Sequence, residues 1–114
     1  MTIKNDLSQL AARLRRARES RGLGQRETAH LVAVSAAFLC RLENPTNNAT
    51  PSEALLWRLA KLLGEDLDTL MHLAGRVSYD ILEQLKTDAS LSKFLRGVRC
   101  RKLTGDQLLP LLDS

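Results

Sequence analysis

Hydrophobic residues recur at helical spacing along most of this 114-residue chain. The first such segment has apolar residues at positions i, i+3, i+4 and i+7, namely Leu7, Leu10, Ala11 and Leu14. This spacing predicts a helix with one buried face. Asp6 can cap the start of the helix, and Gly22 is placed to end it, as glycine does just beyond a helix C-terminus.

Residues 25–44 predict two short helices joined by a tight turn. The first runs from about Gln25 to Val32, with Ala29 and Val32 on one face. The second begins at Ser35, whose hydroxyl can accept hydrogen bonds from the free amides of the first helical turn. A second helix held across a first, with one face left free, has the geometry that places a helix in the major groove of DNA.

The second of these helices has two faces of different character. Leu39, Leu42 and Glu43 share one face at 100° per residue. Small and polar residues occupy the opposite face: Ala36, Ala37, Cys40, Arg41 and Asn44. This second face is suited to a flat or grooved partner rather than to a protein core.

Two more helices complete a predicted all-α domain over residues 1–75. Thr50 and Glu53 form a capping-box pattern with Pro51 at the first helical position, and Gly64 ends the helix that follows. Asp66 starts a fifth helix, which closes at Gly75. Leucines form the apolar faces of both helices: Leu55, Leu56, Leu59, Leu62 and Leu63 in the first, and Leu67 and Leu70 in the second.

Residues 76–114 predict a short helical extension with three apolar segments. Asp88 and Thr104 are positioned as helix caps, and Pro110 prevents a long regular helix near the end. About forty residues cannot bury so many leucines by themselves. We therefore expect the extension to pack on the first domain or on another chain. Four apolar residues share the face of its middle segment: Leu91, Phe94, Leu95 and Val98.

Charge favours an anionic partner. The net charge is +4 and the isoelectric point is near 9.5. Residues 1–44 contain eight basic and four acidic side chains, and arginine dominates the basic set. Arginine suits phosphate oxygens, although such a run can also be a solvated surface. An aromatic content of 4% argues against nucleic-acid binding through base stacking.

The sequence contains no arrangement typical of an enzyme, a metal site or a membrane protein. Cys40 and Cys100 belong to no CxxC pair, and His30 and His72 are far apart in the sequence. We expect no cofactor and no metal. The first residues are polar, and no apolar run reaches the length of a membrane span. These features predict a cytoplasmic protein without a membrane partner.

From about Leu14 to Leu73 the chain resembles the lambda-repressor-like helix-turn-helix regulators, also called xenobiotic-response-element-type regulators. The resemblance rests on several segments at fixed spacing: residues 18–25, Ala29, Val34-Ser35, Leu39, residues 41–44, Pro51-Ser52 and residues 59–64. It implies a five-helix DNA-binding domain. Two departures stand out. Ala33 occupies a turn position where relatives usually have glycine, and Ala36 and Ala37 replace the polar residues that often open the recognition helix.

The resemblance also implies which residues form the binding site. Gln25 contacts the DNA backbone in relatives, and an arginine and a glutamate at the positions of Arg18 and Glu43 commonly pair. Arg18 lies on the buried stripe of the first helix, so its charge needs such a partner. The residues expected at the DNA are Gln25, Ser35, Ala36, Ala37, Cys40, Arg41, Asn44, Thr46 and Asn47.

These observations favour a sequence-specific regulator of double-stranded DNA, acting as a dimeric repressor on a dyad-symmetric operator. Regulators of this family often use a helical tail to dimerise or to meet a regulatory protein, so we expect Leu91, Phe94, Leu95 and Val98 at a homodimer interface or a docking site. The alternative is a protein–protein adaptor or an antitoxin-type autoregulator. Such a protein would keep the fold with weak direct base readout, because alanine can contact only a thymine methyl group.

Overall fold

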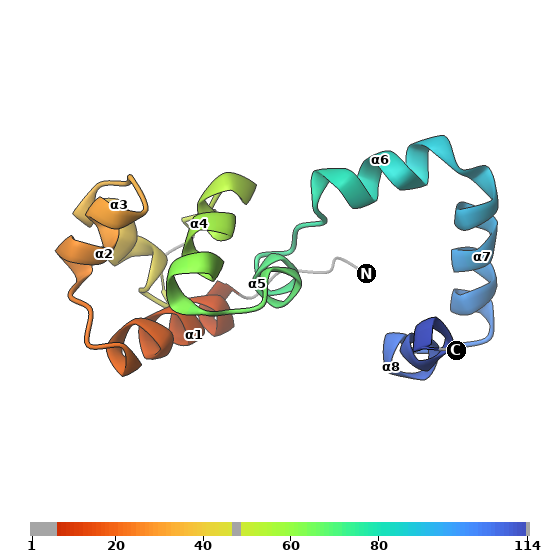
Figure 1. The fold of residues 1–114 in the computed structure, drawn as a ribbon, viewed down its shortest axis with the longest axis horizontal. Helices are drawn as coiled ribbons and strands as arrows, with labels where there is room; N and C mark the ends of the chain where they lie inside the picture. Colours follow the sequence, from red (N-terminus) through yellow and green to blue (C-terminus); the bar gives the residue numbers. More distant parts are fainter. Residues whose placement is uncertain (1–6, 47–48, 114) are drawn as a thin grey trace. The chain divides into compact units, whose positions relative to one another are not determined.

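A computed structural model describes residues 7–46 and 49–113, and every regular element within them is helical (Figure 1). The all-α prediction is therefore confirmed. The chain divides into two units, residues 1–78 and residues 79–114. The first contains α1 (Leu7–Ser20), α2 (Gln25–Leu31), α3 (Ala36–Leu42), α4 (Glu53–Leu63) and α5 (Leu67–Leu73). The second contains α6 (Tyr79–Thr87), α7 (Ala89–Cys100), α8 (Gly105–Leu108) and the 3-10 helix η1 (Leu109–Asp113).

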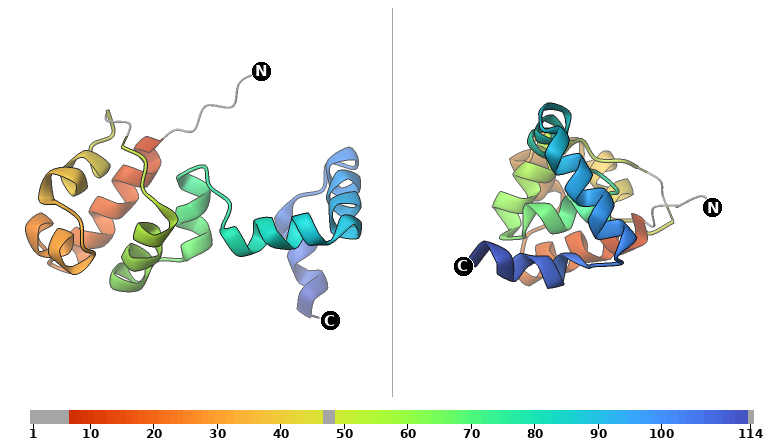
Figure 2. Two further views of the ribbon diagram at one scale, coloured as in Figure 1. Left: turned by 90° about the horizontal axis from the view of Figure 1, so that it is seen from above. Right: turned by 90° about the vertical axis from the view of Figure 1, so that its right-hand side faces the viewer.

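The first unit is organised around one hydrophobic core. Helix α2 packs against α3, α4 packs against α5, and α1 contacts both α4 and α5 (Figures 1 and 2). Each helix supplies its predicted apolar face, so the core consists mainly of leucines. The largest side chains buried there are Leu10, Leu14, Val32, Leu39, Leu56, Leu59 and Leu70.

Most helix ends in this unit follow the local sequence. Ser35 and Asp66 cap α3 and α5 with their side chains. Gly22, Gly64 and Gly75 adopt left-handed backbone angles directly after α1, α4 and α5 or one residue later. Asp6, the predicted cap of α1, lies outside the described residues.

The predicted start of α4 is wrong. Ser52, not Thr50, caps this helix, because its hydroxyl accepts a hydrogen bond of 3.1 Å from the Leu55 amide. Pro51 therefore precedes the helix instead of opening it, and its side chain is fully buried. The cap of α4 therefore lies two residues after the cap that the capping-box pattern predicts.

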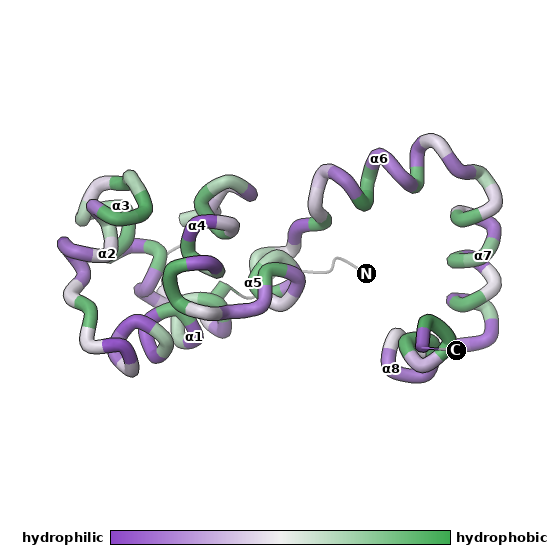
Figure 3. Tube along the Cα trace, in the orientation of Figure 1, coloured by the Kyte–Doolittle hydropathy of each residue, from purple (hydrophilic) through white to green (hydrophobic). Residues whose placement is uncertain are grey.

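The second unit forms the predicted helices without burying any described residue. Asp88 caps α7, Thr104 and Gln107 form a complete capping box at α8, and Pro110 lies in η1. Apolar and polar positions alternate along α6 and α7 at helical spacing (Figure 3). The division between the units falls after Ser78 rather than after Gly75, so residues 76–78 belong with the first unit.

Candidate nucleic-acid interface

The turn between α2 and α3 sets the direction of α3. Ala33 has a φ of 61°, and the Val34 amide donates to the Ala29 carbonyl over 2.9 Å, which closes the end of α2. The left-handed angle, usually adopted by glycine, costs an alanine about 1 kcal/mol. Ser35 then caps α3 by accepting from the Phe38 amide over 3.0 Å. The Ser35 hydroxyl oxygen thus accepts the capping hydrogen bond, while the hydroxyl hydrogen is available to donate to a ligand.

Helix α3 has the two faces that the sequence predicts. Leu39 and Leu42 are buried in the core, with 0% and 3% of their surfaces exposed, and Glu43 is buried beside them. The side chains of the opposite face are exposed. They are Ala36, Ala37, Cys40 and Arg41, followed by Asn44 just beyond the helix.

Arg41 does not extend freely into solvent. Its guanidinium lies over the ring of Phe38, 5.5 Å from the ring centroid, one helical turn earlier. Phe38 is half-buried against the core, so it forms a fixed platform for the charge. We did not identify Phe38 as a site residue from the sequence, although its i, i+3 spacing from Arg41 is the signal that would have indicated the contact.

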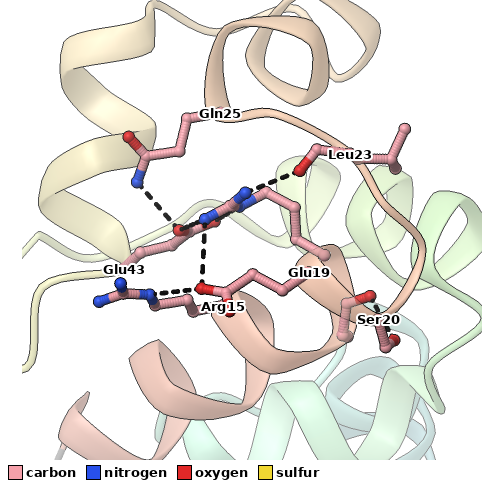
Figure 4. A network of polar contacts seen from close by, with 8 residues as sticks. Arg15, Glu19, Ser20, Leu23, Gln25 and Glu43 are labelled. Carbon is pink, nitrogen blue, oxygen red and sulfur yellow. Dashed lines mark hydrogen bonds and ion pairs between the residues drawn. The ribbon is translucent and has the colours of Figure 1, made fainter.

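A buried ion pair joins α1 to the end of α3. Arg18 Nε and Nη2 donate to the two carboxylate oxygens of Glu43 over 2.8 and 2.9 Å, and Arg18 Nη1 donates to the Leu23 carbonyl over 2.7 Å (Figure 4). Only 8% of Arg18 and 4% of Glu43 is exposed. The hydrogen bonds that Arg18 donates to the Glu43 carboxylate raise the pKa of Arg18 above its ordinary value, so the pair remains charged. This bidentate contact fixes the orientation of α3 relative to α1.

Gln25 is connected to the same ion pair. Its side-chain amide donates to Glu43 Oε1 over 3.0 Å (Figure 4). Gln25 opens α2, and its N-cap Gly24 supplies no side-chain hydrogen bond to the first turn. The half-buried Gln25 side chain is thereby positioned next to backbone amides of the kind that bind phosphate.

Most arginines of α1 and of the turn after it bond within the protein, so the excess of basic residues in the sequence overstates the number available to an anionic partner. Arg13 pairs with Glu65, Arg15 pairs with Glu19 over 2.7 Å, and Arg21 donates to the Leu63 carbonyl over 2.9 Å. Arg16 and Arg26 are exposed and have no hydrogen-bond or ion-pair partner among the described residues. Together with Arg41, they are the arginines of residues 7–44 best placed to meet an external anion.

The loop after α3 holds itself in a turn. Asn44 Oδ1 accepts hydrogen bonds from the Thr46 amide over 3.0 Å and from the Thr46 hydroxyl over 2.8 Å. This Asx turn orients both exposed side chains next to the end of α3. Asn47, also predicted at the interface, lies outside the described residues.

The described part of the chain contains no group of three or more histidine, cysteine or acidic side chains that could hold a metal ion. Cys40 and Cys100 are both free and exposed. None of the described helices is long and apolar enough to cross a membrane.

Known proteins are similar to this chain in fold and in sequence family. The clp gene regulator ClgR from Corynebacterium glutamicum superposes with a TM-score of 0.51 at 23% identity, covering 83% of this chain and 92% of that one. A complex of the SinR and SinI proteins gives a TM-score of 0.48 at 22% identity, with 91% of each chain covered. A sequence search among curated proteins finds no match. The family model for the helix-turn-helix domain matches residues 9–73, which is more than half of the chain. The chain therefore belongs to the helix-turn-helix domain family.

Proposed function

We propose that the protein is a repressor that binds a dyad-symmetric operator in duplex DNA as a homodimer. The observation that carries the proposal is α3, whose exposed face consists of small residues and one cation, Arg41, while a buried ion pair holds its opposite side. A helix so held can enter the major groove with its exposed face toward the base edges. Occupying a promoter is sufficient for repression, because bound protein excludes other proteins from the same DNA.

The exposed residues at α3 suggest specific contacts with the base edges. Arg41 presents the fork that suits guanine O6 and N7, held by the Phe38 ring. Ala36 and Ala37 let the helix approach closely and can touch thymine methyl groups, and Ser35 can donate one hydrogen bond. Cys40 lies on the same face.

Contacts with the DNA backbone position this helix. Gln25 faces the first phosphate site at the start of α2, while Arg16 and Arg26 supply charges that no described carboxylate neutralises. Asn44 and Thr46 extend the polar rim beyond α3. Because Ala36 and Ala37 cannot hydrogen-bond to bases, these phosphate contacts contribute a large share of the affinity.

The second unit supplies the dimer contact. Leu91, Phe94, Leu95 and Val98 share one face of α7, and 52% of Phe94 and 43% of Leu95 is exposed in the single chain. Each apolar side chain of this size gains about 1.5–3 kcal/mol when it is fully buried. A second copy of α7 offers a matching surface, and pairing two chains brings two recognition helices to two half-sites about 34 Å apart.

Selection of bound sequences from random duplex DNA tests the base contact. The wild-type protein should enrich a dyad-symmetric site, and Arg41→Ala should lose its preference at one position of each half-site, a discrimination of about 1–3 kcal/mol. Arg16→Ala, the matched control, should weaken binding to all sequences without altering the preferred site.

Two results would contradict this assignment. An Arg41→Ala protein with an unchanged site would remove Arg41 from base readout. If the wild-type protein bound no DNA at moderate salt, the adaptor function indicated by Ala36 and Ala37 would replace the repressor.

Sedimentation equilibrium of the full chain and of residues 1–78 tests the dimer. The full chain should dimerise at tens of micromolar, while the shorter fragment should remain folded and monomeric, because α1–α5 contain their own core. A monomeric full chain would contradict the dimer. If both proteins dimerised equally, the interface would lie outside the second unit, which could then serve to dock a regulatory protein.

A further inference from the structure

Helix α7 has a second face whose chemistry dimerisation does not use. Lys93, Arg96 and Arg99 are spaced at i, i+3 and i+6, and all three are exposed. At 100° per residue they span about one third of the helix circumference. Their centre lies roughly opposite the apolar face that contains Phe94 and Val98.

The side chains of these three cations have no partner among the described residues. No side-chain hydrogen bond, ion pair or ring contact joins Lys93, Arg96 or Arg99 to residues 7–46 or 49–113. From Ala89 to Gly105 the sequence contains five basic residues and no acidic one, with Arg101 and Lys102 following the helix. The nearest preceding acid, Asp88, already accepts hydrogen bonds from the Ser90 and Leu91 amides as the helix cap.

We propose that this basic face binds the phosphate backbone of duplex DNA without sequence preference, giving the protein a second DNA contact outside the helix-turn-helix domain. The inference rests on the proposed DNA-binding function and adds a surface to it. Three side chains over six residues span about 9 Å along a helix. Successive nucleotides of one strand are about 3.4 Å apart along the DNA axis, so this length covers two to three phosphates.

The arrangement favours DNA over an anionic membrane surface. A helix lying in a membrane interface buries its apolar face in lipid and keeps its cations at the flanks, where they reach the headgroups. In α7, Lys93 and Arg96 lie about 150° around the helix from the centre of the apolar face, so lipid burial would point these two cations away from the membrane, and only Arg99 lies at the edge of that face, beside Leu95. Burial of the same apolar face in a dimer leaves the cations outward, available to a phosphate backbone.

Salt-dependent binding to a duplex without an operator site tests the inference. Each phosphate contact contributes about 0.9 to the slope of log affinity against log salt concentration. The full-length variant Lys93→Gln, Arg96→Gln, Arg99→Gln should have a slope whose magnitude is smaller than that of the wild type by about 2–3. Its preferred operator in a selection experiment should remain the same, because α3 is untouched.

A matched control removes the same number of charges elsewhere. The variant Lys61→Gln, Arg76→Gln, Lys86→Gln should keep the wild-type slope. Circular dichroism and sedimentation equilibrium on both variants establish that helix content and dimerisation are unchanged. If dimerisation is lost, the slope is compared per monomer with that of the wild-type protein diluted below its dissociation constant.

The possible outcomes separate the two proposals. A wild-type protein that binds no duplex at low salt would overturn both the DNA-binding function and this second contact. Wild-type binding with an unchanged slope in the α7 variant would overturn only the second contact, as would an equal loss of slope in both variants. If the α7 variant kept its DNA slope but lost binding to phosphatidylserine vesicles that the wild type binds, the basic face would be a membrane contact instead.

Discussion

The two units of this chain use the same local signals and reach different degrees of burial. Both contain capped amphipathic helices, yet Leu10, Leu39 and Leu70 of the first unit are fully buried, whereas no described residue from Tyr79 to Asp113 is. Caps and periodicity specify where helices form and which face is apolar. Burial additionally needs enough elements to surround that face, and five helices in the first unit provide them. We therefore expect the second unit to depend more on a partner for its stability.

The largest effect should come from breaking the polar contact inside the buried unit. Glu43→Ala leaves Arg18 charged without its carboxylate partner, which costs about 3–5 kcal/mol for a buried pair. Since about 1 kcal/mol shifts the melting temperature of a small domain by about 4–8 °C, thermal unfolding should occur more than ten degrees lower. Glu19→Ala, which breaks the exposed pair with Arg15 and a longer contact of 3.9 Å with Arg18 but leaves the Arg18–Glu43 hydrogen bonds in place, should lower the melting temperature much less. A nearly unchanged melting curve for Glu43→Ala would show that the two charges are solvated.

Phe94→Ala tests the opposite side of the comparison. Truncating an aromatic side chain at the centre of an interface commonly costs at least about 2 kcal/mol, which is a roughly 30-fold rise in the dimer dissociation constant. Melting of the first unit should not change. Leu31→Ala is the matched control, because Leu31 is also 52% exposed but lies in the first unit. Analytical ultracentrifugation distinguishes the two variants, and equal dimerisation of Phe94→Ala and wild type would remove Phe94 from the interface.

Ala33→Gly should make the first unit more stable. Glycine relieves the left-handed strain of about 1 kcal/mol at φ 61°, and the greater freedom of the unfolded chain offsets part of this gain, so stability should rise by less than about 1 kcal/mol. Differential scanning calorimetry should show a higher melting temperature. Ala37→Gly, within helix α3, should have the reverse effect. If both glycines destabilise, the turn carries no strain.

The smallest effect concerns acid. Hydrogen bonds from the Thr69 hydroxyl and amide lower the pKa of Asp66 below its ordinary value of 3.8. The contribution of this cap is therefore fully present above pH 3.8 and is lost as the pH falls through the lower folded-state pKa. Asp66→Asn keeps a capping oxygen that does not titrate, so its melting temperature should fall less than that of wild type between pH 5 and pH 2.5. Asp68→Asn, which removes a charge but no cap, should keep the wild-type difference.

The sequence predicts the structure correctly where the determining contacts are local. Helix positions, the caps Ser35 and Asp66 and the two faces of α3 all depend on residues within one or two turns of each other. The Arg18–Glu43 pair was also found, because a charge on an otherwise apolar stripe requires a partner. In contrast, the start of α4 was misplaced, since burial of Pro51 depends on the assembled core.

Long-range polar contacts explain why the sequence does not predict which arginines are available to a partner. Arg13 binds Glu65 and Arg21 binds the Leu63 carbonyl, and these partners lie 52 and 42 residues away. A count of charges along the chain cannot show that these arginines are already engaged. That Arg16 and Arg26 have no side-chain partner among the described residues follows only from the three-dimensional contacts of their neighbours.

The exposed face of α3 should tolerate substitutions that change which DNA sequence the protein binds. Leu39, Leu42 and Glu43 hold the helix in place, whereas Ala36, Ala37 and Cys40 are exposed and do not pack in the core. Polar side chains introduced at those three positions would meet no core and would leave the ion pair intact. If α3 contacts DNA as proposed, we therefore expect new operator preferences to arise by substitutions that are nearly neutral for folding, so that specificity can change while the fold stays the same.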